Sequence, residues 1–141
     1  MTEPARPIYR HLATLEWETA KDQKAEVAAL AAQADEVGAR RSRLTTGQHG
    51  FHSHISEMPP GFEVPPHTHN ISELMVILEG SIAVTGSDDD AGTTLGAGDT
   101  VVIPANHLYG FTVGDEGVRF LVARAADAAT DFDNATGKNR E

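Results

Sequence analysis

The spacing of apolar residues predicts two regions of different structure along the chain. Residues 19–38 carry apolar side chains at helical spacing, namely Val27, Leu30, Ala34 and Val37. Thr19 is a suitable N-cap for such a helix, and Gly38 is a natural C-terminal stop. We therefore expect one Ala-rich α-helix, which would lie on the outside of a β domain.

From residue 42 onwards the apolar residues follow a period of two, and Gly and Pro become frequent between the runs. The predicted strands are Arg43–Thr46, Phe51–Met58, Glu63–Val64, Ile71–Glu79, Ser81–Thr85, Thr100–Ile103, Leu108–Val113 and Val118–Ala123. Many short strands at regular spacing are typical of a β-sandwich or a small barrel. The fold class predicted for this part of the chain is therefore all-β.

The segment Leu74–Leu78 is apolar on both alternating faces, which is not expected of a strand with one wet face. Either the N-terminal segment or a second subunit must cover its outer face. The only tryptophan, Trp17, precedes the predicted helix, so we expect an arm that packs onto something rather than a free tail. We divide the chain into an arm and helix (1–41), a barrel (42–124) and a polar tail (125–141).

Composition narrows the choice of partners and chemistry. Eleven basic and 21 acidic residues give the 141-residue chain a formal net charge of −10. This charge argues against nucleic acid or an anionic membrane as a partner, because both favour Lys and Arg. The absence of cysteine excludes disulfide scaffolds, Cys-ligated zinc, iron–sulfur clusters and thiol catalysis. Without a membrane-length apolar run or a signal-peptide core, we expect a cytoplasmic protein.

Candidate chemistry is concentrated in His67, His69 and Glu73. These odd-numbered positions project to one face of an extended chain, so two imidazoles and a carboxylate can converge on one ion. Such ligands suit Fe(II), Mn(II), Ni(II), Co(II) or Zn(II). Pro65 and Pro66 stiffen the segment before the first ligand. A surface His-x-His and an edge carboxylate are the alternative, but a carboxylate buried in an apolar strand needs a partner.

A second alternating pair, His52 and His54, is harder to place. Phe51 and Ile55 lie on the opposite face of the same predicted strand, and we expect these apolar residues to face the core. The two histidines would then form a polar outer face. The alternative is that they line the same cavity as the predicted metal ligands.

Five residues follow the pattern Gly-x5-His-x-His-x3-Glu-x6-Gly: Gly61, His67, His69, Glu73 and Gly80. This segment resembles the complete first motif of the cupin family. The resemblance implies a jelly-roll β-barrel with the metal near its centre. It also implies a frequent homodimer, which would cover the apolar outer face of Leu74–Leu78.

The second cupin motif is matched only in part. Gly98 and Pro104 match, Asn106 replaces a glycine, Tyr109 replaces the histidine that usually gives the fourth ligand, and Val113 replaces an asparagine. Asparagine is a mild replacement for glycine, because it also tolerates the left-handed conformation.

The tyrosine at position 109 leaves four ligand arrangements open. His107 could become the fourth ligand after a local shift, or the Tyr109 phenolate could ligate directly. Alternatively, only His67, His69 and Glu73 ligate, and Tyr109 is a hydrogen-bond donor or acid. That set of two histidines and one carboxylate is associated with non-haem iron oxygenases. A site that binds metal poorly or not at all is the fourth arrangement.

These observations predict a mononuclear-metal enzyme of dioxygenase type that acts on a small oxygen-bearing molecule. The expected cofactor is a divalent ion of Fe, Mn, Ni or Zn, with Glu73 and Tyr109 as catalytic residues. The alternative is a cupin that binds a small molecule as a sensor without turnover, with or without metal. A structural dimer with a vestigial site is a third class, and no helix-turn-helix pattern indicates a DNA-bound regulator.

Overall fold

The computed structural model describes residues 5–19, 38–86 and 92–131. Its strands are β1 (Glu18–Thr19), β2 (Arg40–Thr46), β3 (His52–Met58), β4 (Glu63–His69), β5 (Glu73–Thr85), β6 (Thr94–Gly96), β7 (Thr100–Ile103), β8 (Tyr109–Arg124) and β9 (Thr130–Asp131). A short 3₁₀ turn, Leu12–Thr14, precedes β1, and a second one, Gln48–Gly50, connects β2 to β3. The all-β fold predicted from the period-two pattern is confirmed.

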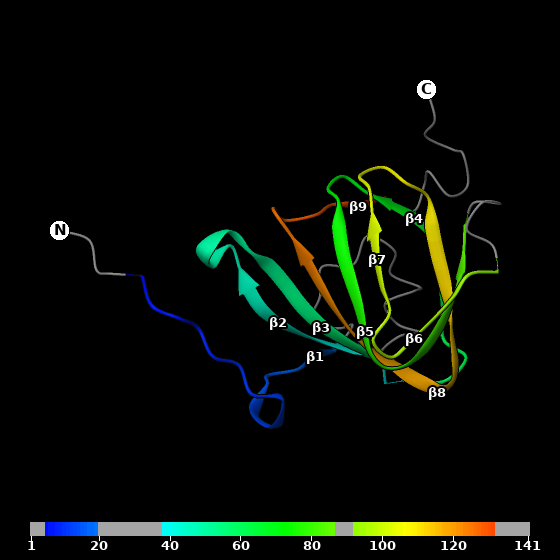
Figure 1. Cartoon of the computed structure of the whole chain (residues 1–141), viewed down its shortest axis with the longest axis horizontal. Helices are drawn as coiled ribbons and strands as arrows, with labels where there is room; N and C mark the ends of the chain where they lie inside the picture. Colours follow the sequence, from blue (N-terminus) through cyan, green and yellow to red (C-terminus); the bar gives the residue numbers. More distant parts are fainter. Residues whose placement is uncertain (1–4, 20–37, 87–91, 132–141) are drawn as a thin grey trace.

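The strands form one antiparallel sheet that curves into a barrel (Figure 1). The order is β1-β2-β3-β8-β4-β9, and β5 pairs with β8 as well as with β6 and β7. The two longest strands, β5 and β8, pair over most of their length, from Glu73 opposite Arg124 to Thr85 opposite Gly110. They therefore act as the spine to which the shorter strands are attached.

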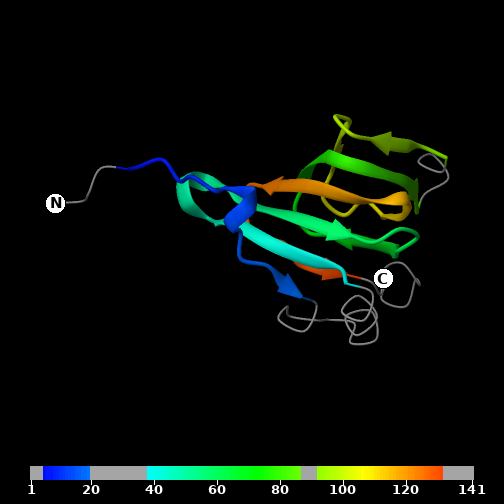
Figure 2. The same cartoon turned by 90° about the horizontal axis from the view of Figure 1, so that it is seen from below.

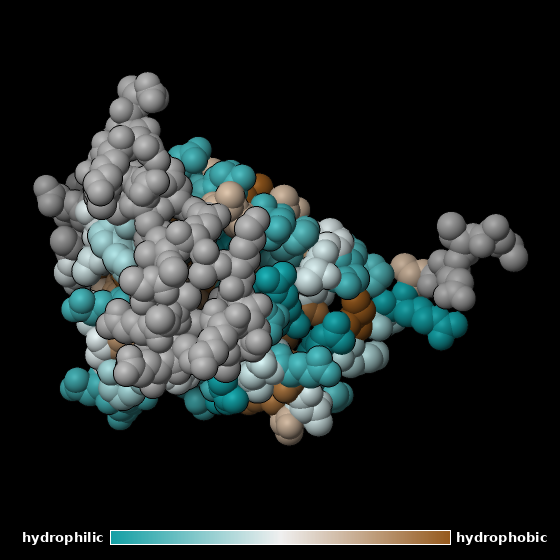
Figure 3. Space-filling view, turned by 180° about the vertical axis from the view of Figure 1, so that it is seen from behind, coloured by the Kyte–Doolittle hydropathy of each residue, from teal (hydrophilic) through white to brown (hydrophobic). Residues whose placement is uncertain are grey.

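The core lies between the inward faces of these strands. Its most deeply buried apolar side chains are Met75, Ile77, Ile82 and Val122, each at most 2% exposed. Phe111 and Phe120 meet edge to face with ring centroids 5.8 Å apart, the geometry that aromatic quadrupoles favour. Seen from behind, the described surface is largely hydrophilic, with hydrophobic residues in small separate patches (Figure 3).

The strand breaks predicted at Gly80 and at Gly114–Gly117 are wrong, because β5 and β8 run through both positions. Instead, the β5–β8 register shifts between Ile77 and Glu79 and again between Gly80 and Ile82. Gly80 has a φ of 78°, and a Cβ atom there would collide with the carbonyl oxygen of Gly117. The glycines therefore permit a bulge at a close backbone crossing rather than ending a strand.

The N-terminal arm packs along β2, outside the barrel (Figure 2). The guanidinium of Arg40 lies 3.9 Å from the centre of the Trp17 ring, and Arg10 Nε donates to the Leu44 carbonyl oxygen over 2.9 Å. Thr19, predicted as a helix N-cap, ends β1 instead. The rest of the predicted helix, residues 20–37, lies outside the described residues.

The start of the predicted C-terminal tail contributes to the sheet. In β9, Thr130 and Asp131 pair with the end of β4, opposite His69 and Thr68. Residues 132–141 lie outside the described part of the chain, and the division of the chain into three parts stays a prediction. No helix within the described ranges has the length and apolar character needed to cross a membrane.

Candidate metal centre

Three strands bring the predicted ligands together. His67 on β4 lies directly opposite Tyr109 on β8, and Glu73 on β5 lies opposite Arg124 on β8. The β4–β8 register shifts between Val64 and His67, at the two prolines, which have no N–H to donate to a ladder. The period-two pattern thus positions His67 and His69 on β4 and Glu73 at the start of β5.

The polar atoms of these side chains converge on His69. Its Nε2 atom lies 3.2 Å from His67 Nε2, 3.3 Å from Glu73 Oε1 and 3.3 Å from the Tyr109 hydroxyl oxygen. The Tyr109 hydroxyl donates to Glu73 Oε1 over 3.2 Å. His67, Glu73 and Tyr109 are each at most 5% exposed. The predicted His–His–Glu set therefore forms one buried cluster with Tyr109.

Both imidazoles are neutral at pH 7. Burial, only partly offset by a hydrogen bond to the Pro65 backbone, lowers the pKa of His67 to about 4. Burial and the charge of Arg124 lower the pKa of His69 to about 4. His67 Nδ1 donates to the Pro65 carbonyl oxygen over 2.8 Å. Because a neutral ring has one N–H, His67 Nε2 carries a lone pair that points at His69.

Arg124 is the functional neighbour that the sequence analysis missed. One of its terminal nitrogens donates to Glu73 Oε1 over 3.3 Å, and its side chain is only 15% exposed. The predicted strand Val118–Ala123 ends one residue too early to include it. The alternation of Phe120 and Val122, extended by two positions, was the available signal for an inward-facing residue 124.

Tyr109 is a neutral hydrogen-bond donor to Glu73 in this structure, and its role as a phenolate ligand stays a prediction. Burial and the neighbouring Glu73 carboxylate raise the pKa of Tyr109 well above 10. The phenol therefore keeps its proton and donates it to Glu73. Its ring also lies against the His67 ring, with centroids 4.6 Å apart.

His107 lies in the turn between β7 and β8 and stays a predicted fourth ligand. Its backbone N–H donates to the Pro104 carbonyl oxygen over 3.2 Å. Asn106 in the same turn has a φ of 66° and donates its N–H to the His69 carbonyl oxygen over 2.7 Å. Asparagine thus adopts the left-handed conformation at this position, and the turn is held against the second imidazole.

The expected polar outer face is wrong for His54. This residue pairs with Val122, which is 1% exposed and points into the barrel, and paired residues share a face. Burial, followed by the charges of Arg41 and Arg124, lowers the pKa of His54 well below 6.5. Phe51, expected in the core, is 57% exposed and precedes β3. His54 therefore lines the interior that contains the His–His–Glu cluster.

The donor atoms are of the kinds that a divalent transition metal takes in proteins. Two donors at about 2.0–2.1 Å from a tetrahedral ion lie about 3.3 Å apart, close to the 3.2 and 3.3 Å separations around His69. As the side chains stand, however, no group of three or more His, Asp or Glu residues in the described ranges is arranged so that it could hold a metal ion. Instead, Tyr109 and Arg124 engage Glu73 Oε1.

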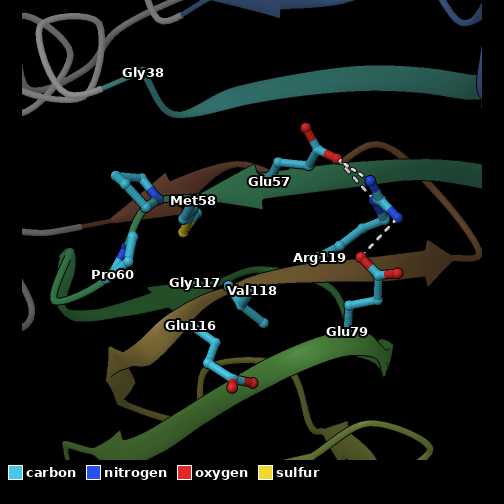
Figure 4. Close-up of a pocket in the computed structure, with 10 residues that line it drawn as sticks. Gly38, Glu57, Met58, Pro60, Glu79, Glu116, Gly117, Val118 and Arg119 are labelled. Carbon is cyan, nitrogen blue, oxygen red and sulfur yellow. Dashed lines mark hydrogen bonds and ion pairs between the residues drawn. The ribbon is translucent and has the colours of Figure 1, made fainter.

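A second, open pocket of about 340 Å³ shares no lining residue with this cluster (Figure 4). It lies where β3 ends beside the Gly117 bulge of β8. Beside it, Arg119 bridges Glu57 and Glu79, with N–O separations of 2.6 and 2.9 Å. Three of its four charged side chains, those of Glu57, Glu79 and Arg119, are therefore already paired with one another.

The fold and the buried cluster define a β-barrel protein with a candidate metal centre. The family model described as "Cupin domain" matches residues 54–124, half of the chain. The protein belongs to the cupin family, as its first motif predicted. No curated protein matches the chain.

Several solved structures share the fold. The polyketide cyclase RemF from Streptomyces resistomycificus is 26% identical with a TM-score of 0.58, over 66% of this chain and 69% of that one. An RmlC-like cupin from Shewanella frigidimarina is 19% identical with a TM-score of 0.61, over 86% and 93%. Oxalate decarboxylase from Bacillus subtilis is 22% identical with a TM-score of 0.55, over 63% of this chain and 25% of that one.

Proposed function

We propose that this cupin is a metal-dependent enzyme of dioxygenase type that acts on a small oxygen-bearing molecule. His67, His69 and Glu73 would hold one divalent ion of Fe, Mn, Ni or Zn. The observation that carries the proposal is the buried convergence of two imidazoles and a carboxylate. His67 Nε2 and Glu73 Oε1 lie 3.2 and 3.3 Å from His69 Nε2. Neutral imidazole nitrogens and a carboxylate oxygen are the ligands that such a cation takes in proteins.

The remaining residues of the cluster have distinct roles in this proposal. The bound metal would polarise an oxygen of the substrate as a Lewis acid. Tyr109 keeps its proton at neutral pH and can donate it, or a hydrogen bond, to an oxygen beside Glu73. Arg124 holds Glu73 Oε1 and limits the orientations of the carboxylate. Glu73 would act as a ligand or, when displaced, as a base.

Two of the structural neighbours support the class of substrate. By their names, one is a polyketide cyclase and the other an oxalate decarboxylase. Polyketides and oxalate are both rich in oxygen, so this fold accommodates such molecules in those proteins. This likeness supports a small oxygen-bearing molecule for the present chain and leaves its identity to experiment.

Metal analysis of the purified protein tests the proposal most directly. We expect about one divalent ion per chain, and loss of that ion in His67→Ala and His69→Ala. His49→Ala is the matched control, because His49 is exposed and bonds the Arg6 carbonyl oxygen outside the cluster. Wild-type protein that takes up no metal, or a His67→Ala variant that retains it fully, would overturn the proposal.

Oxygen consumption with a β-diketone and a flavonol separates the enzyme from a binding module. We expect metal-loaded protein to consume oxygen with at least one of these probes, and the metal-depleted protein to consume none. A protein that binds metal but turns over neither probe would instead be a sensor or binding cupin.

A homodimer is part of the same proposal. Val102 on β7 is 68% exposed and lies directly opposite Leu74 on β5, which is 39% exposed. Leu78, further along β5, is 40% exposed. A second copy of the chain would cover this apolar outer face. Sedimentation equilibrium should give a dimer for the wild type and a monomer for Val102→Asp; a monomeric wild type would contradict this part.

A further inference from the structure

Two arginines inside the barrel have hydrogen-bonding capacity that the protein does not use. In Arg41 and Arg124 the Nε–H group is buried and has no hydrogen-bond partner among the described residues. A buried donor without a partner loses its hydration and gains nothing in return. The terminal nitrogens of the two side chains have partners at longer distances within the described ranges, Glu18 at 4.0 Å from Arg41 and Glu73 at 3.3 Å from Arg124.

The sheet register places both arginines on the inward face, on either side of His54. Arg41 on β2 pairs with Ser56 on β3, which in turn pairs with the core residue Phe120 on β8. Arg124 lies further along β8 on the same alternating face as Phe120. On the same face of β3, His54 lies between Ser56 and His52, and His52 is the residue that pairs with Arg124. The two guanidiniums therefore converge on the interior next to the metal-ligand cluster.

Three arginines and three carboxylates lie near one another here. Arg41 interacts through its charge with Arg43 and Arg124 and with the opposite charges of Glu18 and Asp127, and all three arginines act on His54. Glu18, on the arm, is shared between Arg43 at 3.3 Å and Arg41 at 4.0 Å, while Glu73 is also engaged by Tyr109. Among the described residues, none of these carboxylates accepts a hydrogen bond from the Nε–H of Arg41 or Arg124.

A guanidinium presents its N–H groups in a planar fork that matches the two oxygens of a carboxylate. A small carboxylate ligand would accept hydrogen bonds from the Nε–H groups of Arg41 and Arg124, which have no partner among the described residues. We infer that Arg41 and Arg124 form a carboxylate-binding site beside the His67–His69–Glu73 cluster, and that the substrate is a small organic acid. This inference rests on the proposed function in one respect: the bound acid is a substrate only if the protein is an enzyme. The binding of the acid itself does not require metal.

The test compares binding of carboxylates with that of their uncharged amides. Pyruvate, malonate and benzoate, each with its amide counterpart, are titrated into the full-length protein at low salt by calorimetry. We expect the wild type to bind at least one acid and to bind the matching amide at least tenfold more weakly. Arg41→Gln should weaken binding of the acid on the order of 10- to 100-fold. Arg41→Lys, which keeps the charge but loses the fork, should give a smaller loss.

Arg40→Gln is the matched control. Arg40 precedes Arg41 on β2, points to the opposite face and is bound to Glu57, so its loss removes the same charge outside the site. The affinity of the Arg40→Gln variant for the acid should stay within about twofold of that of the wild type. No binding of any acid, equal binding of acid and amide, or an unchanged affinity in Arg41→Gln would each overturn the inference.

Thermal unfolding separates a binding arginine from a structural one. Because the buried Nε–H of Arg41 has no partner among the described residues, Arg41→Met should unfold without ligand at the wild-type temperature or higher. A structural arginine would give a lower temperature, which would contradict a binding role. The same titration with His67→Ala shows whether binding of the acid depends on the metal ligands. Suppose that His67→Ala still binds the acid, that this binding still requires Arg41, and that metal analysis finds no metal in the wild type. The proposed function then fails, and the carboxylate site stands.

Discussion

Two rows of charged side chains lie on opposite faces of the same strands. The outer row consists of Arg40, Glu57, Arg119 and Glu79, on β2, β3, β8 and β5 in that order. Its charges alternate, and successive members are joined by N–O separations of 2.6 to 2.9 Å. The inner row consists of His54, Arg124 and Glu73 on β3, β8 and β5, together with His67 and His69 beside them on β4.

The difference between the rows shows where the fold retains unfavourable interactions. In the outer row every member has an opposite charge beside it and access to water. In the inner row two imidazoles are held neutral, and an arginine is buried with a donor that finds no partner among the described residues. Local inconsistencies of this kind are expected at functional sites, because a ligand completes them.

The two rows should differ most in how much the free energy of unfolding falls when a carboxylate of β5 is removed. In metal-free protein, Glu73→Gln should lower the free energy of unfolding by about 3 kcal/mol, because it leaves the buried Arg124 charge without its partner. Glu79→Gln in the outer row should change it by less than about 1 kcal/mol. Urea denaturation measures both. Equal effects would mean that the inner ion pair is no more important than the outer one.

Acid should weaken the inner row first. His67 has a folded-state pKa of about 4 against an ordinary value of 6.5, so the unfolded chain binds more protons between these values. Stability is therefore full above pH 6.5 and falls as the pH drops towards 4, on the order of 3 kcal/mol. Urea denaturation of metal-free protein from pH 7.5 to 4.5 checks this. His67→Phe should remove the share of His67 and leave the shares of His69 and His54, whose pKa values are lowered as well. A flat wild-type profile would show that His67 is not buried as a neutral base.

The outer row should respond only at lower pH. Burial tends to raise the pKa of Glu57, but hydrogen bonds from Arg119 and Arg40 outweigh it and lower the pKa below 4.5. Its contribution to stability is therefore present above pH 4.5 and lost below it. The two rows thus predict separate acid windows within one denaturation profile.

Tyr109→Phe should have a moderate effect that decides between ligand and donor. Removing the hydroxyl eliminates the bond to Glu73 Oε1, which should reduce the free energy of unfolding by about 1 kcal/mol. Metal content should be unchanged, because the neutral phenol is a donor in this structure. Metal analysis and urea denaturation of the variant provide both values. Loss of the metal in this variant would instead indicate that the Tyr109 phenolate is a metal ligand.

Arg119→Gln should have the smallest effect. Arg119 bridges Glu57 and Glu79 at a surface open to water, so its removal should lower the free energy of unfolding by about 1 kcal/mol or less. The difference from wild type should shrink further in 1 M NaCl, where the Debye length is about 3 Å. A larger, salt-independent loss would show that the outer row is part of the core.

The sequence predicts those parts of the site that depend on one strand alone. His67, His69 and Glu73 share parity and match the first cupin motif, so their convergence could be predicted without knowing the strand partners. The positions of Arg124 and His54 inside the barrel follow only from the register of β3, β8 and β5. Register depends on contacts across the sheet, which apolar spacing within one strand does not report.

Local composition also misled the analysis where glycine serves two purposes. Gly80 and Gly114–Gly117 were interpreted as strand ends, since glycine commonly marks turns. In the barrel they mark bulges within long strands, because two backbones cross where no side chain fits. Phe51 was placed in the core on hydrophobicity alone, yet it lies in the turn that precedes β3, where strand alternation does not apply.

The bulge at Gly80 has a consequence for which side chains enter the barrel. Before it, odd-numbered residues of β5 such as Met75 and Ile77 are buried; after it, the even-numbered Ile82 is buried. On β8 the same exchange occurs across Gly114–Gly117, between Val113 and Phe120. An odd number of additional residues in each strand thus reverses inside and outside midway along it: one in β5 between Ile77 and Glu79, and three in β8 between Val113 and Val118. Deleting Gly80 would break this phase relation, so that Glu73 and Ile82 could no longer both face the interior.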